Sequence, residues 1–349
     1  MSVCPKNACA GGYGSCLDVK LTNACNANCS FCIEKDGLRP QEVPADIMAQ
    51  AARNDPADTV LVLGGEPMIN IDRLVQFLKL LRLPVKLVSD KDDSVKDRAQ
   101  TRKVYITTNG CFLNAQTARQ IAPYLDGINI SLHHYHRALA NSILQLPDGA
   151  SNQVSFNRLQ EAIRVFHTPD ETGRRVPVRI NTNLVKNWLD TPDDALKFID
   201  FAARTLHADC VRFTELQHCE DSWVNARSVF PDFAYHGLPA DPFTQGCEQE
   251  IDAHPDIRVI VKMGCGLVCD ARKPLDTKFR QAMYDQAPKN RNTRVLYPDG
   301  VIRPGWVKAK PAADSLDTDG LSVYDCHRTL GNYHDVPQSD FGCHGADCH

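Results

Sequence analysis

The stretch Ala24–Cys32 (ACNANCSFC) places three cysteines, Cys25, Cys29 and Cys32, within eight residues. A closed structural metal site usually has four protein ligands, so this run is one ligand short. It directly follows Cys16–Asn23 (CLDVKLTN), whose residue types predict a β-strand. We therefore expect a loop at the carboxyl end of a strand that holds three thiolates around one metal centre with an open coordination position.

The bulk composition narrows the class of protein. The chain has 349 residues, a formal net charge of −4 and 15 cysteines. There is no basic surplus for nucleic-acid binding, and no apolar run approaches the ~20 residues of a membrane span. The start, MSVCPKNACAGGYG, lacks the apolar core of a signal peptide, which predicts a cytoplasmic protein. In that compartment many thiols favour metal or redox chemistry over disulfides.

Strand-type and helical patterns alternate along the chain to about residue 217. We expect six strands, within Cys16–Asn23, Thr59–Gly65, Lys103–Gly110, Gly127–His134, Val176–Val185 and Cys210–Gln217. Apolar residues at three- and four-residue spacing predict intervening helices over 71–82, 155–166 and 193–206. This order predicts an α/β fold, an open partial (β/α)6 TIM barrel over residues 16–217 with its chemistry at the carboxyl ends of the strands.

The alternation stops after this barrel, where proline, glycine and cysteine become frequent. We expect residues 1–15 to form an N-terminal cysteine-containing segment and residues 218–349 a cysteine-rich C-terminal extension. Within the extension, Arg294–Trp306 (RVLYPDGVIRPGW) predicts a β-hairpin that turns at Asp299–Gly300.

Two metal chemistries suit the three cysteines. A [4Fe–4S] cube bound by three cysteines keeps one iron open, as a catalytic centre requires. The alternatives are a zinc site with a distant fourth ligand and a set of unrelated buried cysteines. Zinc knuckles usually show two CxxC-like pairs, and no second pair lies beside this one in the sequence, so the spacing favours the cluster.

The motif CxxxCxxC, with the aromatic Phe31 before its last cysteine, resembles the radical S-adenosylmethionine (SAM) superfamily. The run Leu63–Pro67 (LGGEP), at the end of the second predicted strand, is similar to the GGE motif of that family. The resemblance covers roughly residues 16–217. It implies that SAM chelates the open iron through its amino and carboxylate groups, and that reduction releases a 5′-deoxyadenosyl radical. By this resemblance, SAM replaces the absent fourth ligand.

The same resemblance implies a set of cofactor contacts. In the GGE motif, the two glycines would let the backbone approach SAM, and the carboxylate of Glu66 would bind its ammonium group. Residues at the ends of the later strands match positions near the SAM methionine, ribose and adenine. The implied contacts are Phe31, Gly64, Gly65, Glu66, Pro67, Asn109, Ser131, Asn181 and Asn183.

The extension resembles the SPASM or twitch domains of this family, which hold auxiliary clusters. Their hairpin glycine is followed five residues later by a ligand cysteine, whereas here Gly300 is followed by Gly305. A degenerate twitch-like scaffold is therefore expected. An auxiliary iron–sulfur cluster, or a zinc site with His344 or His349, would draw on Cys247, Cys265, Cys269, Cys326, Cys343 and Cys348. The alternative is that these cysteines are buried or lie in a loose tail.

Family membership implies hydrogen abstraction from a bound substrate and an electron donor such as flavodoxin or ferredoxin. Four side chains near the barrel mouth are catalytic candidates: His133, His134, Arg179 and Arg212. The two arginines would hold a carboxylate or phosphate, or else pair with a glutamate such as Glu215. The early cysteine motif favours a small molecule, such as a sugar, nucleotide or natural-product intermediate. The alternatives are a peptide-modifying maturase with an auxiliary cluster and a non-catalytic zinc or iron–sulfur module.

Overall fold

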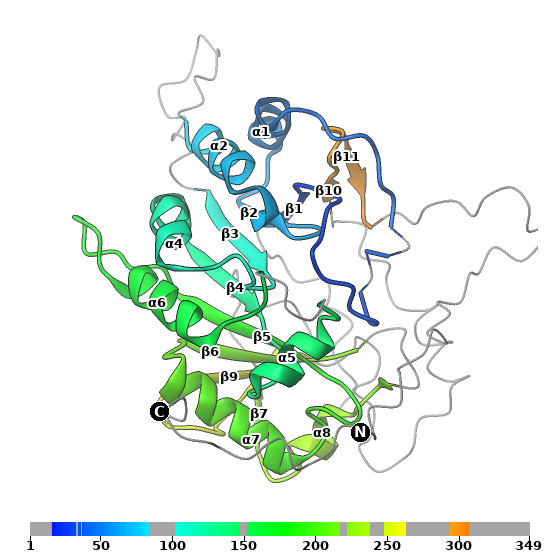
Figure 1. Cartoon of the computed structure of the whole chain (residues 1–349), viewed down its shortest axis with the longest axis vertical. Helices are drawn as coiled ribbons and strands as arrows, with labels where there is room; N and C mark the ends of the chain where they lie inside the picture. Colours follow the sequence, from blue (N-terminus) through cyan, green and yellow to red (C-terminus); the bar gives the residue numbers. More distant parts are fainter. Residues whose placement is uncertain are drawn as a thin grey trace, which may run out of the picture.

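The computed structural model describes residues 16–32, 34–35, 37–83, 102–146, 152–216, 222–237, 248–262 and 294–306. Within these residues the strands form a single 11-stranded sheet in the order β11-β10-β1-β2-β3-β4-β5-β6-β9-β8-β7. Figure 1 shows strands and helices alternating along the chain from β1 to β6. The first and last strands in this order do not pair with each other, so the barrel is open, as predicted.

The six predicted strands are present and pair in parallel. They are β1 (Cys16–Lys20), β2 (Thr59–Leu63), β3 (Lys103–Thr108), β4 (Gly127–Ser131), β5 (Val178–Leu184) and β6 (Cys210–Glu215). Most end earlier than predicted. Gly64 and Gly110 have φ angles of +87° and +79°, a left-handed backbone that turns the chain out of β2 and β3.

Five further strands come from the region after residue 217. They are β7 (Tyr235–Gly237), β8 (Glu248–Ile251), β9 (Arg258–Lys262), β10 (Arg294–Leu296) and β11 (Ile302–Pro304). β9 pairs in parallel with β6, and β10 in parallel with β1, so the sheet crosses the predicted boundary at residues 217 and 218. The division into a barrel and an extension stays a prediction. The hairpin is confirmed, because β10 and β11 are antiparallel.

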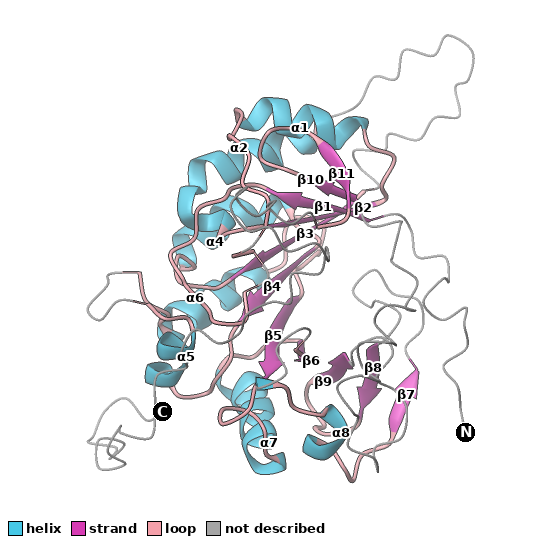
Figure 2. Cartoon of the chain, turned by 90° about the vertical axis from the view of Figure 1, so that its right-hand side faces the viewer, coloured by secondary structure: helices cyan, strands magenta, loops and turns pink. Residues whose placement is uncertain are grey.

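The helices are α1 (Ala45–Asn54), α2 (Ile71–Leu81), α4 (Ala115–Ile121), α5 (Arg137–Ile143), α6 (Phe156–His167), α7 (Pro192–Asp200) and α8 (Ala226–Val229). Figure 2 shows α1, α2, α4 and α6 along one face of the curved sheet. Short turns η1 (Pro67–Asn70), η2 (Ala122–Tyr124) and η3 (Phe201–Thr205) accompany them. The helical stretch expected over 193–206 is present as α7 followed directly by η3, in which the chain widens into a π-helical turn.

The helix pattern read from the sequence explains the core. In α2, Leu74, Phe77, Leu78 and Leu81 are buried on one face, in the spacing that predicted the helix. Each such side chain stabilises the fold by about 1.5–3 kcal/mol relative to an exposed position. Helix α2 begins at Asn70, whose side chain accepts a hydrogen bond from the amide of Arg73.

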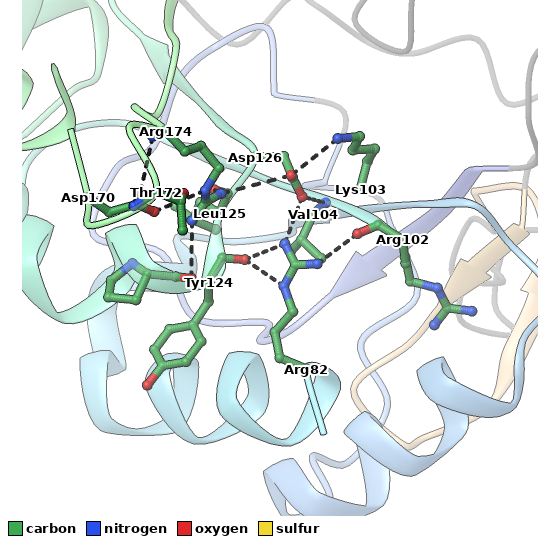
Figure 3. Close-up of polar contacts among 11 residues, drawn as sticks. Arg82, Arg102, Lys103, Val104, Tyr124, Leu125, Asp126, Asp170, Thr172 and Arg174 are labelled. Carbon is green, nitrogen blue, oxygen red and sulfur yellow. Dashed lines mark hydrogen bonds and ion pairs between the residues drawn. The ribbon is translucent and has the colours of Figure 1, made fainter. Parts of the chain in front are cut away.

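A polar network joins the amino ends of the central strands (Figure 3). The Asp126 carboxylate pairs with Arg82 at 2.7 Å and accepts the amide of Val104 at 2.8 Å. Lys103 and Arg174 approach the other carboxylate oxygen at 3.5 and 3.9 Å. This network ties the end of α2 to the starts of β3 and β4, at the barrel edge opposite the loops that carry chemistry.

Two predictions concern residues outside those that the structure describes. The cysteines proposed for an auxiliary site, Cys247, Cys265, Cys269, Cys326, Cys343 and Cys348, lie outside them. The same holds for residues 1–15. None of the helices in the described ranges has the length and apolar character needed to cross a lipid bilayer.

Candidate functional site

The three cysteines lie in the loop that follows β1, here named the cysteine loop (residues 21–38). Cys25 is exposed, Cys29 and Cys32 are half-buried, and all three are free thiols. Across the described part of the chain, no three His, Cys, Asp or Glu side chains converge as they would on a single metal ion. A [4Fe–4S] cluster is held by cysteine thiolates, and the assignment of these three cysteines to one stays a prediction.

While no metal is bound, the electrostatics of the loop favour the protonated thiol over the thiolate. Burial, together with the neighbouring thiols, raises the pKa of Cys29 to about 12, and burial raises the pKa of Cys25 to about 11. The sulfur of Cys25 accepts a hydrogen bond from the amide of Ala27 at 3.4 Å. The thiols are therefore protonated at neutral pH without metal, and cluster assembly would release their protons.

The end of β2 touches the backbone of the cysteine loop directly. The amide of Glu66 donates to the carbonyl of Ala24 at 2.8 Å. Gly65 has a φ of +55°, and a Cβ atom placed on it would lie 2.1 Å from that carbonyl oxygen. Only glycine fits such an approach. The Gly64–Pro67 segment, here named the cradle, thus lies directly beside the three cysteines with no side chain at its two glycines, and its contact with SAM stays a prediction.

Glu66 has a structural role that the sequence did not reveal. Its side chain is buried and accepts hydrogen bonds from the amides of Met68 and Asn109, at 2.9 and 2.6 Å, and from the Thr108 hydroxyl at 2.7 Å. Burial raises its pKa to about 7, although these three donors oppose the shift. The carboxylate therefore fastens the end of β2 to the end of β3. Its contact with the SAM ammonium group stays a prediction.

Asn109 links the same corner to the cysteine loop. Its side-chain amide donates to the Oδ1 atom of Asn26 at 2.8 Å, while its own Oδ1 accepts the amide of Cys111 at 3.0 Å. Cys111 is fully buried and interacts electrostatically with Cys25, a neighbour that no motif in the sequence indicated. The predicted site residue Asn109 therefore lies against the loop and positions it.

Two of the predicted site residues, at the end of β4 and in the middle of β5, lie side by side in the sheet. Ser131 and Asn181 are register partners on these parallel strands. The Asn181 side chain is buried, and its Oδ1 atom has no hydrogen-bond partner within the described structure. A buried acceptor without a donor suits a ligand hydroxyl group, which agrees with the ribose contact implied for this residue. The backbone amide of Asn183 instead donates to the Nδ1 atom of His133 at 3.2 Å.

An aromatic group covers one side of the cysteine loop. The ring of Phe31 meets His133 edge-on at 5.0 Å and Trp188 at 6.2 Å between ring centroids. Burial lowers the pKa of both His133 and His134 to about 4, so each ring is neutral at pH 7. The Nδ1 atom of His134 accepts the amide of His136 at 2.9 Å. Trp188 was missed, since a tryptophan between strand and helix carries no signal of its own.

The predicted arginines lie on the face of the sheet shared with Asn181. The Nε atom of Arg179 donates to Oδ1 of Asn129 at 2.9 Å. Arg212 pairs with Glu248 of β8 at 2.9 Å, whereas the sequence suggested Glu215, which instead accepts the amide of Ala226. The pairing was missed because Glu248 belongs to a strand that joins the sheet from the C-terminal region.

Lys262, at the end of β9, completes this charged group. Burial lowers its pKa from 10.5 to about 8, with further lowering by Arg212 and Arg179 and an opposing effect of Glu248. Asp18 on β1 also acts on Lys262, and burial raises the pKa of Asp18 to about 6. No motif marked Lys262, and only the parallel pairing of β9 with β6 brings it here.

Comparison with known proteins identifies the family. The Radical SAM superfamily profile matches residues 19–199, more than half of the chain. The chain belongs to the radical SAM superfamily. The solved structure of Streptococcus suis SuiB bound to S-adenosylmethionine is similar in fold, with a TM-score of 0.52 at 15% identity. That likeness covers 84% of this chain and 60% of SuiB, and SuiB was also solved with its precursor peptide SuiA.

Similar sequences point to one group of enzymes. The GTP 3',8-cyclase of Chlorobaculum tepidum is 25% identical over 227 residues, which cover 61% of this chain and 57% of that protein. A probable GTP 3',8-cyclase of Saccharolobus solfataricus is 30% identical over 190 residues, covering 53% of this chain and 52% of the relative. The chain thus spans about half the length of the curated relatives it matches.

Membership settles the general chemistry. The chain is a radical SAM enzyme, and a [4Fe–4S] cluster with SAM is the cofactor pair of this superfamily. The non-catalytic reading of the cysteines was wrong, because the family match spans the strands and motifs of a catalytic barrel.

Proposed function

We propose that this radical SAM enzyme abstracts hydrogen from a small-molecule substrate that carries an anionic group. One observation carries the proposal: three cationic side chains, Arg179, Arg212 and Lys262, share one face of the sheet with Asn181. Asn181 pairs in register with Arg212, and Lys262 pairs with Thr214, two residues further along the same strand. Alternate residues of a strand point to the same side, so the four side chains lie on one surface.

The cofactors would be held by the residues around the cysteine loop. Cys25, Cys29 and Cys32 would bind the cluster, and the Gly64–Pro67 cradle with Asn181 would contact SAM. When bound, the pair supplies a 5′-deoxyadenosyl radical that abstracts hydrogen from the substrate. The chain itself orients the substrate and excludes water. The Phe31 group of aromatic rings serves the second purpose, because it covers one side of the loop.

Charge favours an anion over a neutral substrate. The group already holds two carboxylates: Glu248 is fully buried and pairs with Arg212, and Asp18 acts on Lys262 with a pKa that burial raises to about 6. The Nε atom of Arg212 is buried and has no acceptor among the described residues. A carboxylate or phosphate group would satisfy this donor, and arginine binds both in a planar, bidentate geometry.

A substrate survey tests the charge of the substrate. The reconstituted enzyme, with dithionite and SAM, would be given small metabolites in pairs, each carboxylated or phosphorylated compound beside its neutral analogue. We expect only anionic members to raise the release of 5′-deoxyadenosine. In the Arg212→Met variant this stimulation should fall on the order of tenfold or more, while substrate-free SAM cleavage persists. Equal stimulation by neutral analogues would contradict the anionic assignment.

Lys262 offers a test that needs no substrate. Its folded pKa of about 8 lies below the unfolded value, so between pH 8 and 10.5 the unfolded chain binds a proton that the native protein has released. Wild-type stability therefore rises with pH across this window. We expect Lys262→Met to raise the free energy of unfolding at pH 7 by about 3 kcal/mol, with the gain shrinking toward pH 10.

Urea unfolding at pH 7 and pH 9.5 would measure this effect. Lys197→Met is the control, because Lys197 is exposed and forms a surface ion pair with Asp193. It should change the stability little at either pH. A Lys262→Met variant that is less stable than wild type at pH 7 would contradict the view that this lysine is kept at a cost in stability for the sake of binding.

Two partner assignments complete the proposal. A flavodoxin or ferredoxin would reduce the cluster, as the superfamily resemblance implies. The maturase reading, in which a peptide is the substrate, would be favoured if an added peptide and no small molecule stimulated SAM cleavage in the survey. An auxiliary cluster or zinc site would be built from cysteines outside the described residues.

A further inference from the structure

Lys20, the last residue of β1, is a buried lysine outside the proposed substrate surface. Its side chain is 1% exposed. The ammonium group pairs with the carboxylate of Glu34 at 2.5 Å and donates to the carbonyl of Leu38 at 3.0 Å. Both partners belong to the arm of the cysteine loop that follows Cys32. A single cation therefore fastens this arm to the barrel at two points.

The path of the Lys20 side chain is fixed by the end of β2. A Cβ atom on Gly64 would lie 2.4 Å from Cγ of Lys20 and 2.7 Å from its Cα atom. The lysine stem thus occupies the space that any other residue at position 64 would fill. The first glycine of the LGGEP run consequently serves the lysine as well as the cofactor cradle.

The C-terminal hairpin closes the other side of this lysine. The ring centroid of Tyr297 lies 5.8 Å from the Lys20 ammonium group, within the range of a cation–π contact. Tyr297 is 1% exposed and lies in the turn between β10 and β11. The hairpin is also bonded to the segment before α1, because Val43 donates to the carbonyl of Pro298 at 2.8 Å.

We propose that Lys20 is a positioning residue that clamps the cysteine loop, and that the C-terminal hairpin braces this clamp through Tyr297. Glu34 lies two residues after Cys32, so its position limits where that cysteine can lie. The hairpin carries Gly305 where a twitch domain would carry a ligand cysteine. Its contribution to the site is mechanical support of the loop. The clamp does not depend on which substrate binds. It affects the cluster only if Cys25, Cys29 and Cys32 are the cluster ligands, as proposed above.

Hydrogen exchange of the full-length apo protein tests the clamp without any cofactor. In Lys20→Met, the half-buried carboxylate of Glu34 loses its partner, which should loosen the arm. We expect amides of residues 28–38 to exchange on the order of tenfold faster than in wild type, and Tyr297→Leu to act in the same direction with a smaller effect. Amides of β3 and β4 should keep their wild-type rates.

Arg82→Met is the matched control, since it removes an ion pair at the opposite edge of the sheet (Figure 3). It should speed exchange around Asp126 and leave residues 28–38 unchanged. If Lys20→Met unfolds globally, Glu34→Gln provides the second test, because it removes the same pair at the loop surface. Wild-type exchange of residues 28–38 in the folded variants would overturn the proposal.

Cluster retention gives an independent readout. After anaerobic reconstitution, Lys20→Met and Glu34→Gln should lose iron to a chelator several times faster than wild type, and the double variant no faster than the worse single one. Additive effects would show that the residues act separately and would overturn the clamp. A wild-type protein that takes up no iron would refute the cluster assignment alone, because the exchange result stands without it.

Discussion

Replacing Gly65 by alanine is expected to separate the cysteine loop from the end of β2 and to abolish detectable SAM binding. The added Cβ atom would lie 2.1 Å from the carbonyl oxygen of Ala24 and 2.9 Å from its carbonyl carbon. These are backbone atoms, which cannot rotate away as a flexible side chain can. The free energy of unfolding should fall by about 3 kcal/mol or more, from the clash and from the left-handed backbone together.

Gly173→Ala separates these two causes. Gly173 has a φ of +79°, yet a Cβ atom on it would meet nothing within 4 Å. This control should lose only the backbone component, about 1–2 kcal/mol, and should bind SAM as wild type does. Urea unfolding and anaerobic equilibrium dialysis with labelled SAM would measure both quantities. Equal losses in the two variants would show that the contact between Gly65 and Ala24 does not shape the site.

The sequence predicted those parts of the fold that depend on local pattern. The spacing of Leu74, Phe77 and Leu81 marked α2, and strand-type runs marked the six central strands. The sequence did not predict the last residue of each strand. A glycine with a positive φ ends β2 and β3, and the need for that turn comes from the residues packed around it in the fold. The partners of β6 and β1 could not be foreseen, since β9 and β10 are short and lie far along the chain.

The candidate site divides in the same way. The three cysteines and LGGEP stand close together because each directly follows a strand, which a sequence pattern reveals. Lys20 and Lys262 belong to no sequence motif. Their roles depend on the side chains and strands that pack beside them in the fold. Glu66 is a third case. The sequence motif indicated a contact with a ligand, and the structure adds hydrogen bonds from Glu66 that join the end of β2 to the end of β3.

The second large effect concerns iron. We expect a variant in which Cys25, Cys29 and Cys32 are all replaced by alanine to lose about four irons and about four sulfides per chain after anaerobic reconstitution, relative to wild type. SAM cleavage should disappear with them. The physical reason is that, by this assignment, the cysteine loop would supply every protein ligand of the cluster, so the variant would have nothing to hold it.

The informative quantity is the iron that remains in that variant. A control with Cys16 and Cys210 replaced by alanine removes two free thiols at other described positions and should keep its cluster. Because neither residue belongs to the cysteine loop, any difference between the two variants belongs to the three motif cysteines. Iron lost completely from the first variant would mean one cluster per chain, whereas about four irons retained would place a second cluster on cysteines beyond the described residues. Full wild-type iron in the first variant would refute the assignment of the cysteine loop.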